Sequence, residues 1–153
     1  MFPEFMQEFK QPIALRWADL DPNFHVRHSV YYDFGAKSRM DFLAELGITS
    51  AHFANDHYGP ILFREECVFR REIKYGDTIF ISTKISKLRK DYARFSFEHE
   101  ITKEDGTLCA VLTVDGAWMD TVLRKLITPP PYLIEVLEKS PRSASFEWME
   151  LKA

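Results

Sequence analysis

The second half of the chain alternates apolar and polar residues through consecutive segments, and this pattern constrains the fold more than any other feature. Alternation with a period of two is typical of strands that bury one face. Pairs of glycine and aspartate separate some of these segments and favour tight turns between antiparallel neighbours. We therefore expect one antiparallel sheet with long strands at 60–75, 79–85, 93–101 and 108–119, and turns at Gly76-Asp77 and Asp105-Gly106.

The first third of the chain predicts a short strand, a polar loop and a long helix. Residues 13–17 alternate as a strand does, whereas residues 29–46 repeat apolar side chains at spacings of three and four. Ser29 is the expected N-cap of this helix, and Gly47 stands where a helix-terminating glycine belongs. A closing helix is expected over 132–138. The apolar stripe that predicts the buried face of the long helix comprises Tyr32, Ala36, Met40 and Leu43.

The order of strand, long helix and four further strands indicates an α+β fold. Five antiparallel strands are expected to wrap around the long central helix. No linker or internal repeat divides the 153 residues, so 1–153 is expected to form a single domain.

Composition argues against several classes of partner. The net charge of -3 lacks the basic character of a nucleic-acid-binding protein, so no nucleic-acid partner is expected. No run of about 18 apolar residues is present, which argues against a membrane span and a membrane partner. Cys67 and Cys109 are the only cysteines. Such sparse use favours free thiols in a reducing compartment, and we expect a cytoplasmic location.

The segment from Arg16 to Tyr31, RWADLDPNFHVRHSVY, carries the chemistry. It places Asp21, Asn23 and His25 on a loop that leads into the N-terminus of the long helix. The first backbone N–H groups of a helix have no partner within the helix and carry the positive end of its dipole. They can polarise a thioester carbonyl, while a nearby carboxylate can activate water or attack the carbonyl carbon.

With these motifs the chain resembles the acyl-CoA thioesterases of the hotdog superfamily, in the branch similar to 4-hydroxybenzoyl-CoA thioesterase. The resemblance covers nearly the whole chain. It rests on the W-x-D-x-D pattern at 17–21, the N-x-H-V pattern at 23–26, a tyrosine ten positions after Asp21 and a Gly-Asp pair before the second long strand. It implies a hotdog fold, hydrolysis of an acyl-CoA, and a homodimer or homotetramer.

The same resemblance implies a role for the polar residues of the loop. Asp21 is expected to be the general base or the nucleophile, and Asn23 and His25 are expected to position substrate or water. A backbone N–H near His28 is the implied oxyanion donor, and Tyr31 is expected to contact the substrate. Neither a metal nor an organic cofactor is implied.

Two further features of the chain bear on the resemblance. Plant acyl-carrier-protein thioesterases share the N-x-H pattern, but their resemblance also implies a glutamate late in the helix. This chain has Ala36-Lys37 there and lacks that glutamate, so Asp21 is favoured as the catalytic carboxylate. Basic residues near a strand-to-strand turn, Arg89 and Lys90, are expected to meet the phosphates of CoA.

Less specific interpretations stay open beside these. Asp19 and Asp21 could cap turns, and a structural role is favoured for Asp19. Asn23 could form only an Asx turn, and His25 could be a hydrogen-bonding loop residue. The acids and histidines of the loop match no specific metal-ligand spacing. His99 lies on the apolar face of a predicted strand, where an interior histidine with satisfied hydrogen bonds is expected.

Three other functions also stay open. The first is hydrolysis of an acyl-carrier-protein thioester instead of an acyl-CoA. The second is a non-catalytic protein of the same fold that binds acyl groups, against which the intact Asp21 argues. The third is a hydratase acting on an enoyl thioester.

Overall fold

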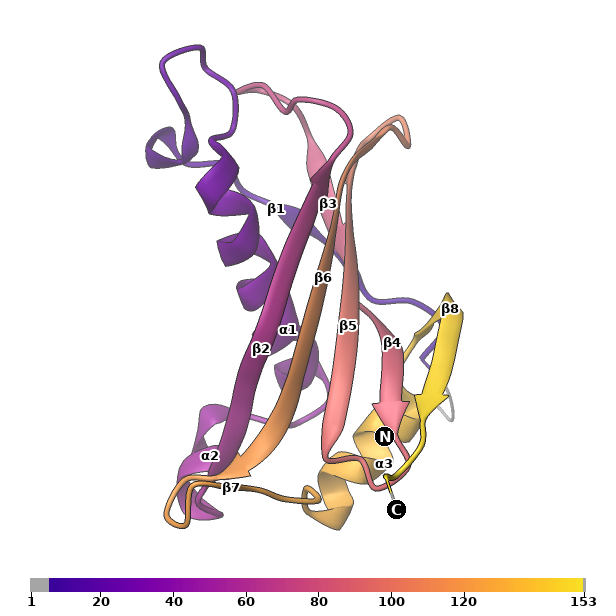
Figure 1. Cartoon of the computed structure of the whole chain (residues 1–153). Coiled ribbons are helices and arrows are strands. Elements are labelled where there is room, and N and C mark those ends of the chain that lie inside the picture. The colour runs from indigo at the N-terminus through magenta and orange to yellow at the C-terminus, as the bar shows by residue number, and fades with distance from the viewer. Residues whose placement is uncertain (1–5, 153) are drawn as a thin grey trace.

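The alternating segments form one continuous sheet, with helix α1 (Tyr31–Glu45) across one face (Figure 1). The computed structural model describes residues 6–152. Two shorter helices, α2 (Ser50–Asn55) and α3 (Pro131–Lys139), lie at one end of the sheet. This is the α+β architecture that the order of elements predicted and the hotdog fold that the resemblance implied. The strands are β1 (Lys10–Ile13), β2 (Tyr58–Phe69), β3 (Ile79–Ser82), β4 (Lys84–Arg89), β5 (Arg94–Lys103), β6 (Leu108–Asp120), β7 (Lys125–Leu126) and β8 (Arg142–Met149).

Strand β6 lies between β2 and β5 and is antiparallel to both. The other edge of β5 pairs with β4 along one part and with β3 along another. Strand β1 extends the sheet from β3, and β8 extends it from β4 in a parallel pairing. Strand β2 pairs with β6 alone among the described strands, so its outer edge is open.

The described sheet has eight strands, whereas the sequence predicted five. The predicted strand 79–85 is divided at Thr83: β3 ends at Ser82 and β4 begins at Lys84. The predicted strand 13–17 lies earlier, as β1, and Trp17 begins a short 3-10 turn instead. Strand β8 follows α3 and had no alternation strong enough to predict it.

The buried face of α1 differs from the predicted apolar stripe. The stripe was wrong because Met40 is 40% exposed and Ala36 is exposed, whereas Gly35 and Ser38 are buried. Small side chains let the helix approach the sheet closely, and the Ser38 hydroxyl is satisfied by Thr83 Oγ1 at 2.6 Å. Hydropathy alone therefore selected a neighbouring face. Among residues 6–152, no helix is both long enough and apolar enough to cross a membrane.

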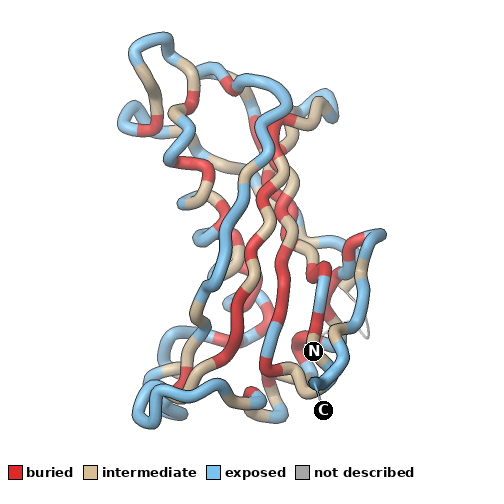
Figure 2. Tube along the Cα trace, in the orientation of Figure 1, coloured by how far each residue is buried: buried red, intermediate tan, exposed pale blue. Residues whose placement is uncertain are grey.

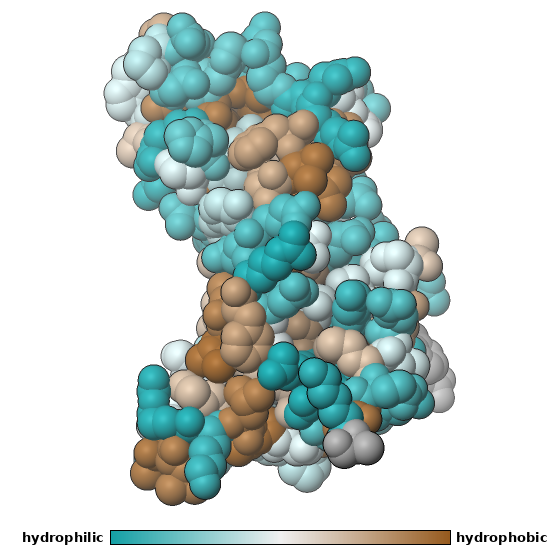
Figure 3. All heavy atoms as spheres, in the orientation of Figure 1, coloured by the Kyte–Doolittle hydropathy of each residue, from teal (hydrophilic) through white to brown (hydrophobic). Residues whose placement is uncertain are grey.

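Burial separates β2 from the rest of the sheet. Figure 2 shows the middle strands largely buried, while β2 is exposed along most of its length. Figure 3 shows hydrophobic patches over both halves of β2 with a hydrophilic band between them. Such an open edge with apolar side chains is a typical site of association. The exposed apolar residues of β2 are Leu62, Phe63, Val68 and Phe69.

Candidate functional site

The loop from Asp21 to His25 is closed by its own hydrogen bonds. The backbone N–H groups of Asn23 and His25 donate to Asp21 Oδ1 at 2.8 and 3.1 Å. The backbone N–H of Asp21 donates to the His25 carbonyl oxygen at 2.8 Å. Phe24 takes a positive φ of 62°, which the tight turn requires. The side chain of Asp21 therefore caps the turn, an interpretation that the sequence left open, whereas the Asx turn considered for Asn23 is not formed by its side chain. Within the described part of the chain, Oδ2 of Asp21 accepts no hydrogen bond.

A distant segment holds this loop in place. The backbone N–H of Val26 donates to the carbonyl oxygen of Ile73 at 2.8 Å, and His25 forms a β-bridge with Lys74. His25 Nε2 lies 3.3 Å from Glu72 Oε2. These contacts bring the end of β2 and the residues after it beside Asp21.

Asp19 has a different environment from Asp21, although the two are close in sequence. Asp19 is buried, and its carboxylate accepts hydrogen bonds from the backbone N–H and from the guanidinium of Arg16. Burial alone would raise the pKa of Asp19, but the hydrogen bonds from Arg16 outweigh it, and the pKa lies below the ordinary value. These contacts are those of the structural residue that the sequence favoured.

The N-terminus of α1 adjoins the loop through a 3-10 turn, His28–Val30. Within the described chain, no backbone carbonyl accepts the N–H of His28 or Ser29. The Ser29 hydroxyl accepts a hydrogen bond from Arg27 Nη1 at 2.6 Å and does not cap the helix, contrary to prediction. Tyr31 is buried against Phe69 with ring centroids 4.9 Å apart, and burial raises the pKa of its hydroxyl to about 12.

These elements enclose a hollow of about 370 Å³ that contains four of the predicted site residues: Asp21, His25, His28 and Tyr31. Its other wall comes from the end of β2 and the residues that follow. Two adjacent cations there, together with Phe69, were not predicted as site residues. In the sequence the two arginines were only a basic pair inside the predicted strand 60–75, and no pattern marked them as part of a site. The wall residues are Phe69, Arg70, Arg71 and Glu72.

Three predicted site residues lie outside this hollow. Asn23 is exposed and contributes its backbone N–H to the loop. Arg89 ends β4 and Lys90 follows it, at the opposite end of the sheet from the Asp21 loop (Figure 1). There Arg89 pairs with Asp91 at 2.8 Å, and Lys90 pairs with Glu150 at 3.1 Å. In one chain, therefore, these two cations are remote from Asp21.

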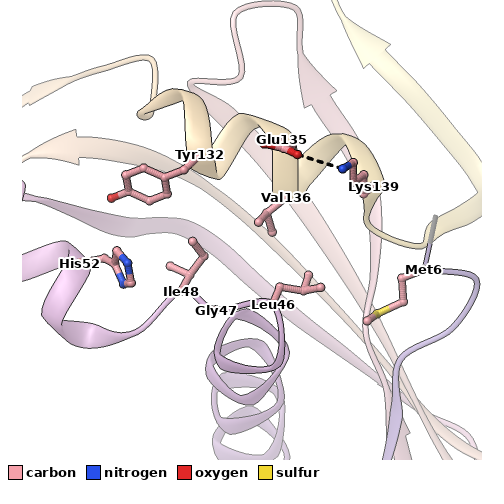
Figure 4. Close-up of a pocket in the computed structure, with 9 residues that line it drawn as sticks. All are labelled: Met6, Leu46, Gly47, Ile48, His52, Tyr132, Glu135, Val136 and Lys139. Carbon is pink, nitrogen blue, oxygen red and sulfur yellow. Dashed lines mark hydrogen bonds and ion pairs between the residues drawn. The ribbon is translucent and has the colours of Figure 1, made fainter. Parts of the chain in front are cut away.

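A second cavity, of about 240 Å³, lies near the other end of α1 (Figure 4). Side chains of α3 and the segment after α1 form its walls, and an ion pair between Glu135 and Lys139 stands on one side. Tyr132 donates to Asp56 at 2.7 Å and lies 2.8 Å from the Tyr58 hydroxyl, so its phenol is already engaged. This cavity has no free carboxylate beside open backbone N–H groups.

The donor sets of the described residues do not suggest a metal centre. Within residues 6–152, no three side chains of His, Cys, Asp or Glu gather closely enough to hold a metal ion. Cys67 and Cys109 are free, and burial raises the pKa of the Cys67 thiol to about 11. A thiol that stays protonated is a poor nucleophile, which leaves Asp21 as the candidate reactive group in the hollow.

Comparison with protein families gives one match. Residues 15–137 match the model of the thioesterase-like superfamily. No curated protein matches the chain.

Solved structures share the fold at low sequence identity. A Staphylococcus aureus protein solved in complex with CoA is 20% identical, with a TM-score of 0.80, over 94% of this chain and 92% of that one. A DHNA-CoA thioesterase from the same organism is 20% identical, with a TM-score of 0.78, over 88% and 91%. A 1,4-dihydroxy-2-naphthoyl-CoA thioesterase from Synechocystis is 16% identical, with a TM-score of 0.77, over 85% and 95%.

Proposed function

Because this chain belongs to the thioesterase-like superfamily and is a thioester hydrolase, we propose that its substrate is an acyl-CoA, which it cleaves with water to a free acid and CoA. One observation carries the proposal. A carboxylate with one free oxygen, Asp21, shares a hollow with the N-terminus of α1. Two of the similar structures are CoA thioesterases, and a third was solved in complex with CoA.

The geometry suits attack on a thioester carbonyl. Oδ1 of Asp21 is held by two backbone N–H groups, which fixes the carboxylate and leaves Oδ2 for chemistry. As a general base, Oδ2 takes a proton from water while the water oxygen bonds to the carbonyl carbon. As a nucleophile, it forms an anhydride that water then cleaves. In both routes the C–S bond breaks, and the sulfur leaves as the CoA thiolate.

Backbone N–H groups at the start of α1 serve as the oxyanion site in this proposal. The N–H groups of His28 and Ser29 are open, and they lie at the positive end of the helix dipole. Negative charge that develops on the carbonyl oxygen is stabilised by such donors. His25, held beside Glu72, orients the water or the substrate.

The cations after β2 are our candidates for the CoA phosphates. Arg70 and Arg71 are exposed and line the same hollow as Asp21. Arginine can bind phosphate through two parallel hydrogen bonds. Arg89 and Lys90 remain a second candidate pair, which could act only from another subunit because they are remote from Asp21 in their own chain.

We also propose a homodimer in which the open edges of two β2 strands pair. Leu62, Phe63, Val68 and Phe69 expose apolar surface along this strand. Antiparallel pairing would satisfy the free edge and bury these side chains. It would also place the Asp21 hollow of one subunit, at the C-terminal end of β2, beside the N-terminal end of β2 in the other.

Light scattering tests the dimer. We expect Val68→Glu to shift the protein toward monomer, because it places a charged carboxylate in the apolar contact between the paired edges, and burying an unpaired charge is costly. Leu151→Glu is the matched control, since Leu151 is 55% exposed after β8, which lies at the edge of the sheet opposite β2. A wild-type monomer at micromolar concentration would contradict the dimer, as would equal effects of the two substitutions.

The function is tested by the release of free thiol from a panel of acyl-CoAs that vary in length and aromaticity. We expect turnover of at least one of them, and undiminished turnover in EDTA, because we expect no metal to take part. If the same acyl group is cleaved faster from acyl carrier protein than from CoA, the carrier-protein alternative is correct. Binding of acyl-CoA without release of thiol would support a non-catalytic acyl-binding protein instead.

A further inference from the structure

A groove of about 220 Å³ between α1 and the sheet is apolar except for one cation. Arg39 on α1 supplies that cation. The walls pack aliphatic and aromatic carbon around it, and they include the helix face that hydropathy had marked for burial. The apolar wall residues are Ala36, Met40, Leu43, Pro60, Leu62, Phe95, Phe97 and Trp118.

Arg39 is held in position by a neutral histidine. His99 is fully buried, and its Nδ1 lies 3.0 Å from the backbone carbonyl oxygen of Ser82, which can only accept a hydrogen bond. Nδ1 therefore carries the proton, and Nε2 is free to accept from Arg39 Nη1 at 3.0 Å. Burial, followed by the charge of Arg39, lowers the pKa of His99 to about 3. His99 thus orients the guanidinium without neutralising or repelling it.

The positive charge of Arg39 has no ion-pair partner. Within residues 6–152, no carboxylate oxygen lies within 4.0 Å of its guanidinium. Burial lowers the pKa of Arg39, and the carboxylate of Glu65, exposed on β2, acts in the opposite direction from farther away. A guanidinium nevertheless stays charged in proteins. Arg39 is partly buried, and a charge that loses part of its hydration is costly unless it is paired, so this groove favours an anion.

The helix is adapted to hold this pair of side chains. A Cβ at Gly35 would stand 3.3 Å from Arg39 Nη1 and 3.3 Å from His99 Cδ2, which is tighter than an ordinary contact. Glycine within a helix is destabilising relative to alanine. Its presence here leaves the room that the Arg39–His99 contact occupies.

The same wall is short of hydrogen-bond acceptors. Trp118 is buried, and its indole Nε1–H has no partner within the described chain. That nitrogen is shielded from solvent, so it does not itself mark a contact with a ligand. Among the described residues that line the groove, the guanidinium of Arg39 is therefore the group that selects an anionic occupant.

We propose that this groove binds an acyl group that carries a second carboxylate, with that carboxylate on Arg39 and the carbon skeleton against the apolar walls. The inference rests on the proposed function and deepens it: the substrate class is the CoA thioester of a dicarboxylic acid. A guanidinium and a carboxylate form two parallel hydrogen bonds, which gives both affinity and direction. Tyr31, Gly35 and Arg39 share one face of α1, and eight helical residues span about 12 Å, the scale of an extended acyl chain.

Matched pairs of substrates test the proposal. The pairs are glutaryl- and pentanoyl-CoA, adipoyl- and hexanoyl-CoA, suberoyl- and octanoyl-CoA, and terephthaloyl- and 4-methylbenzoyl-CoA. We expect a higher kcat/KM for the carboxylated member of at least one pair. Arg39→Gln should lower that value by about tenfold or more, because hydrogen bonds to a charged group are lost. The neutral member should change little, and Arg39→Lys should fall between wild type and Arg39→Gln.

Lys37→Gln is the matched control, because Lys37 is an exposed cation on the same helix that pairs with Asp41. It should leave both members of each pair unchanged. Circular dichroism shows whether each variant is folded. If Arg39→Gln does not fold, the comparison of wild type with Arg39→Lys tests the inference instead. A wild-type preference for the neutral member of every pair would overturn the inference, as would an equal loss on both members in Arg39→Gln.

A direct binding measurement separates this inference from the proposed function. Free octanoate, whose own carboxylate can reach Arg39, should raise the melting temperature of wild type and of Lys37→Gln but not of Arg39→Gln. If no acyl-CoA is cleaved and this pattern is nevertheless found, the carboxylate site stands and the proposed function fails. If neutral acyl-CoAs are cleaved and the pattern is absent, the proposed function stands and the carboxylate site fails.

Discussion

The segment Arg16–Leu20 and the segment Asp21–His25 each contain one carboxylate, and the two carboxylates differ in burial and in hydrogen bonding. In the first, Asp19 is 1% exposed and accepts three hydrogen bonds from Arg16. In the second, Asp21 is half-buried, one of its oxygens closes the turn, and the other has no partner within the described chain. A carboxylate with both oxygens engaged in hydrogen bonds stabilises the fold. A carboxylate that is fixed through one oxygen keeps the other oxygen available for reaction.

The largest effect that would sharpen this comparison is the loss of turnover in Asp21→Asn. The asparagine keeps a carbonyl oxygen for the N–H groups of Asn23 and His25, so the loop should keep its shape. Loss of the carboxylate should lower kcat by roughly a hundredfold or more, the usual contribution of a general base. The measurement is thiol release at saturating acyl-CoA, and near-native turnover in the folded variant would refute the assignment.

Asp19→Asn should show the reverse behaviour. It removes the ion pair with Arg16 and part of the hydrogen bonding, and it should lower the free energy of unfolding by about 1–2 kcal/mol. Turnover per folded molecule should stay within about twofold of wild type, because no transition-state contact is lost. Urea unfolding and thiol release measure the two quantities. A large loss of kcat with unchanged stability would reverse the roles of the two acids.

A smaller effect concerns the pH dependence of stability. The pKa of Asp19 is below its ordinary value of 3.8 in the folded protein, because hydrogen bonds from Arg16 outweigh the effect of burial. Its stabilisation is therefore complete above pH 3.8 and is lost as pH falls through the lower folded-state pKa. Urea midpoints between pH 2 and pH 6 should fall less steeply toward acid in Asp19→Asn than in wild type. Identical slopes would show that Asp19 does not contribute in this way.

The smallest effect concerns the cations. Replacing Arg70 and Arg71 together by glutamine should raise KM for the acyl-CoA severalfold and leave kcat nearly unchanged, because exposed phosphate contacts are screened. The effect should vanish with a pantetheine thioester that lacks the nucleotide. Arg89→Ala with Lys90→Ala is the comparison. If only that pair raises KM for the nucleotide-bearing substrate, the basic turn after β4 binds CoA and Arg70 and Arg71 do not.

Local chemistry explains which parts of the fold could be predicted. Gly47, Gly76 and Gly106 all have positive φ, so the end of α1 and the two turns followed from the conformational freedom of glycine. The loop at Asp21 could be predicted because aspartate, proline and asparagine favour turns, and the aspartate side chain can accept hydrogen bonds from the backbone of its own turn. Alternation located β2, β5 and β6 because each has a regular strand pattern.

Contacts between distant segments explain what could not be predicted. The buried face of α1 depends on Gly35 and Ser38, whose small side chains matter only once a sheet lies against them. Arg70 and Arg71 line the same hollow as Asp21 because the backbone N–H of Val26 donates to the carbonyl oxygen of Ile73, and no local pattern encodes that pairing. The family and its thioester chemistry were confirmed, whereas the roles of individual site residues remain predictions.

The central claim is that Asp21 acts on the thioester and does not merely shape the loop. The most direct test is the affinity of wild type and of Asp21→Asn for a thioether analogue of the best acyl-CoA substrate, which cannot be hydrolysed, measured by titration calorimetry. If Asp21 is the reacting group, the two dissociation constants should agree within about threefold while turnover differs by roughly a hundredfold. An affinity that falls in proportion to the lost turnover would show that Asp21 only holds the loop, and would contradict the claim.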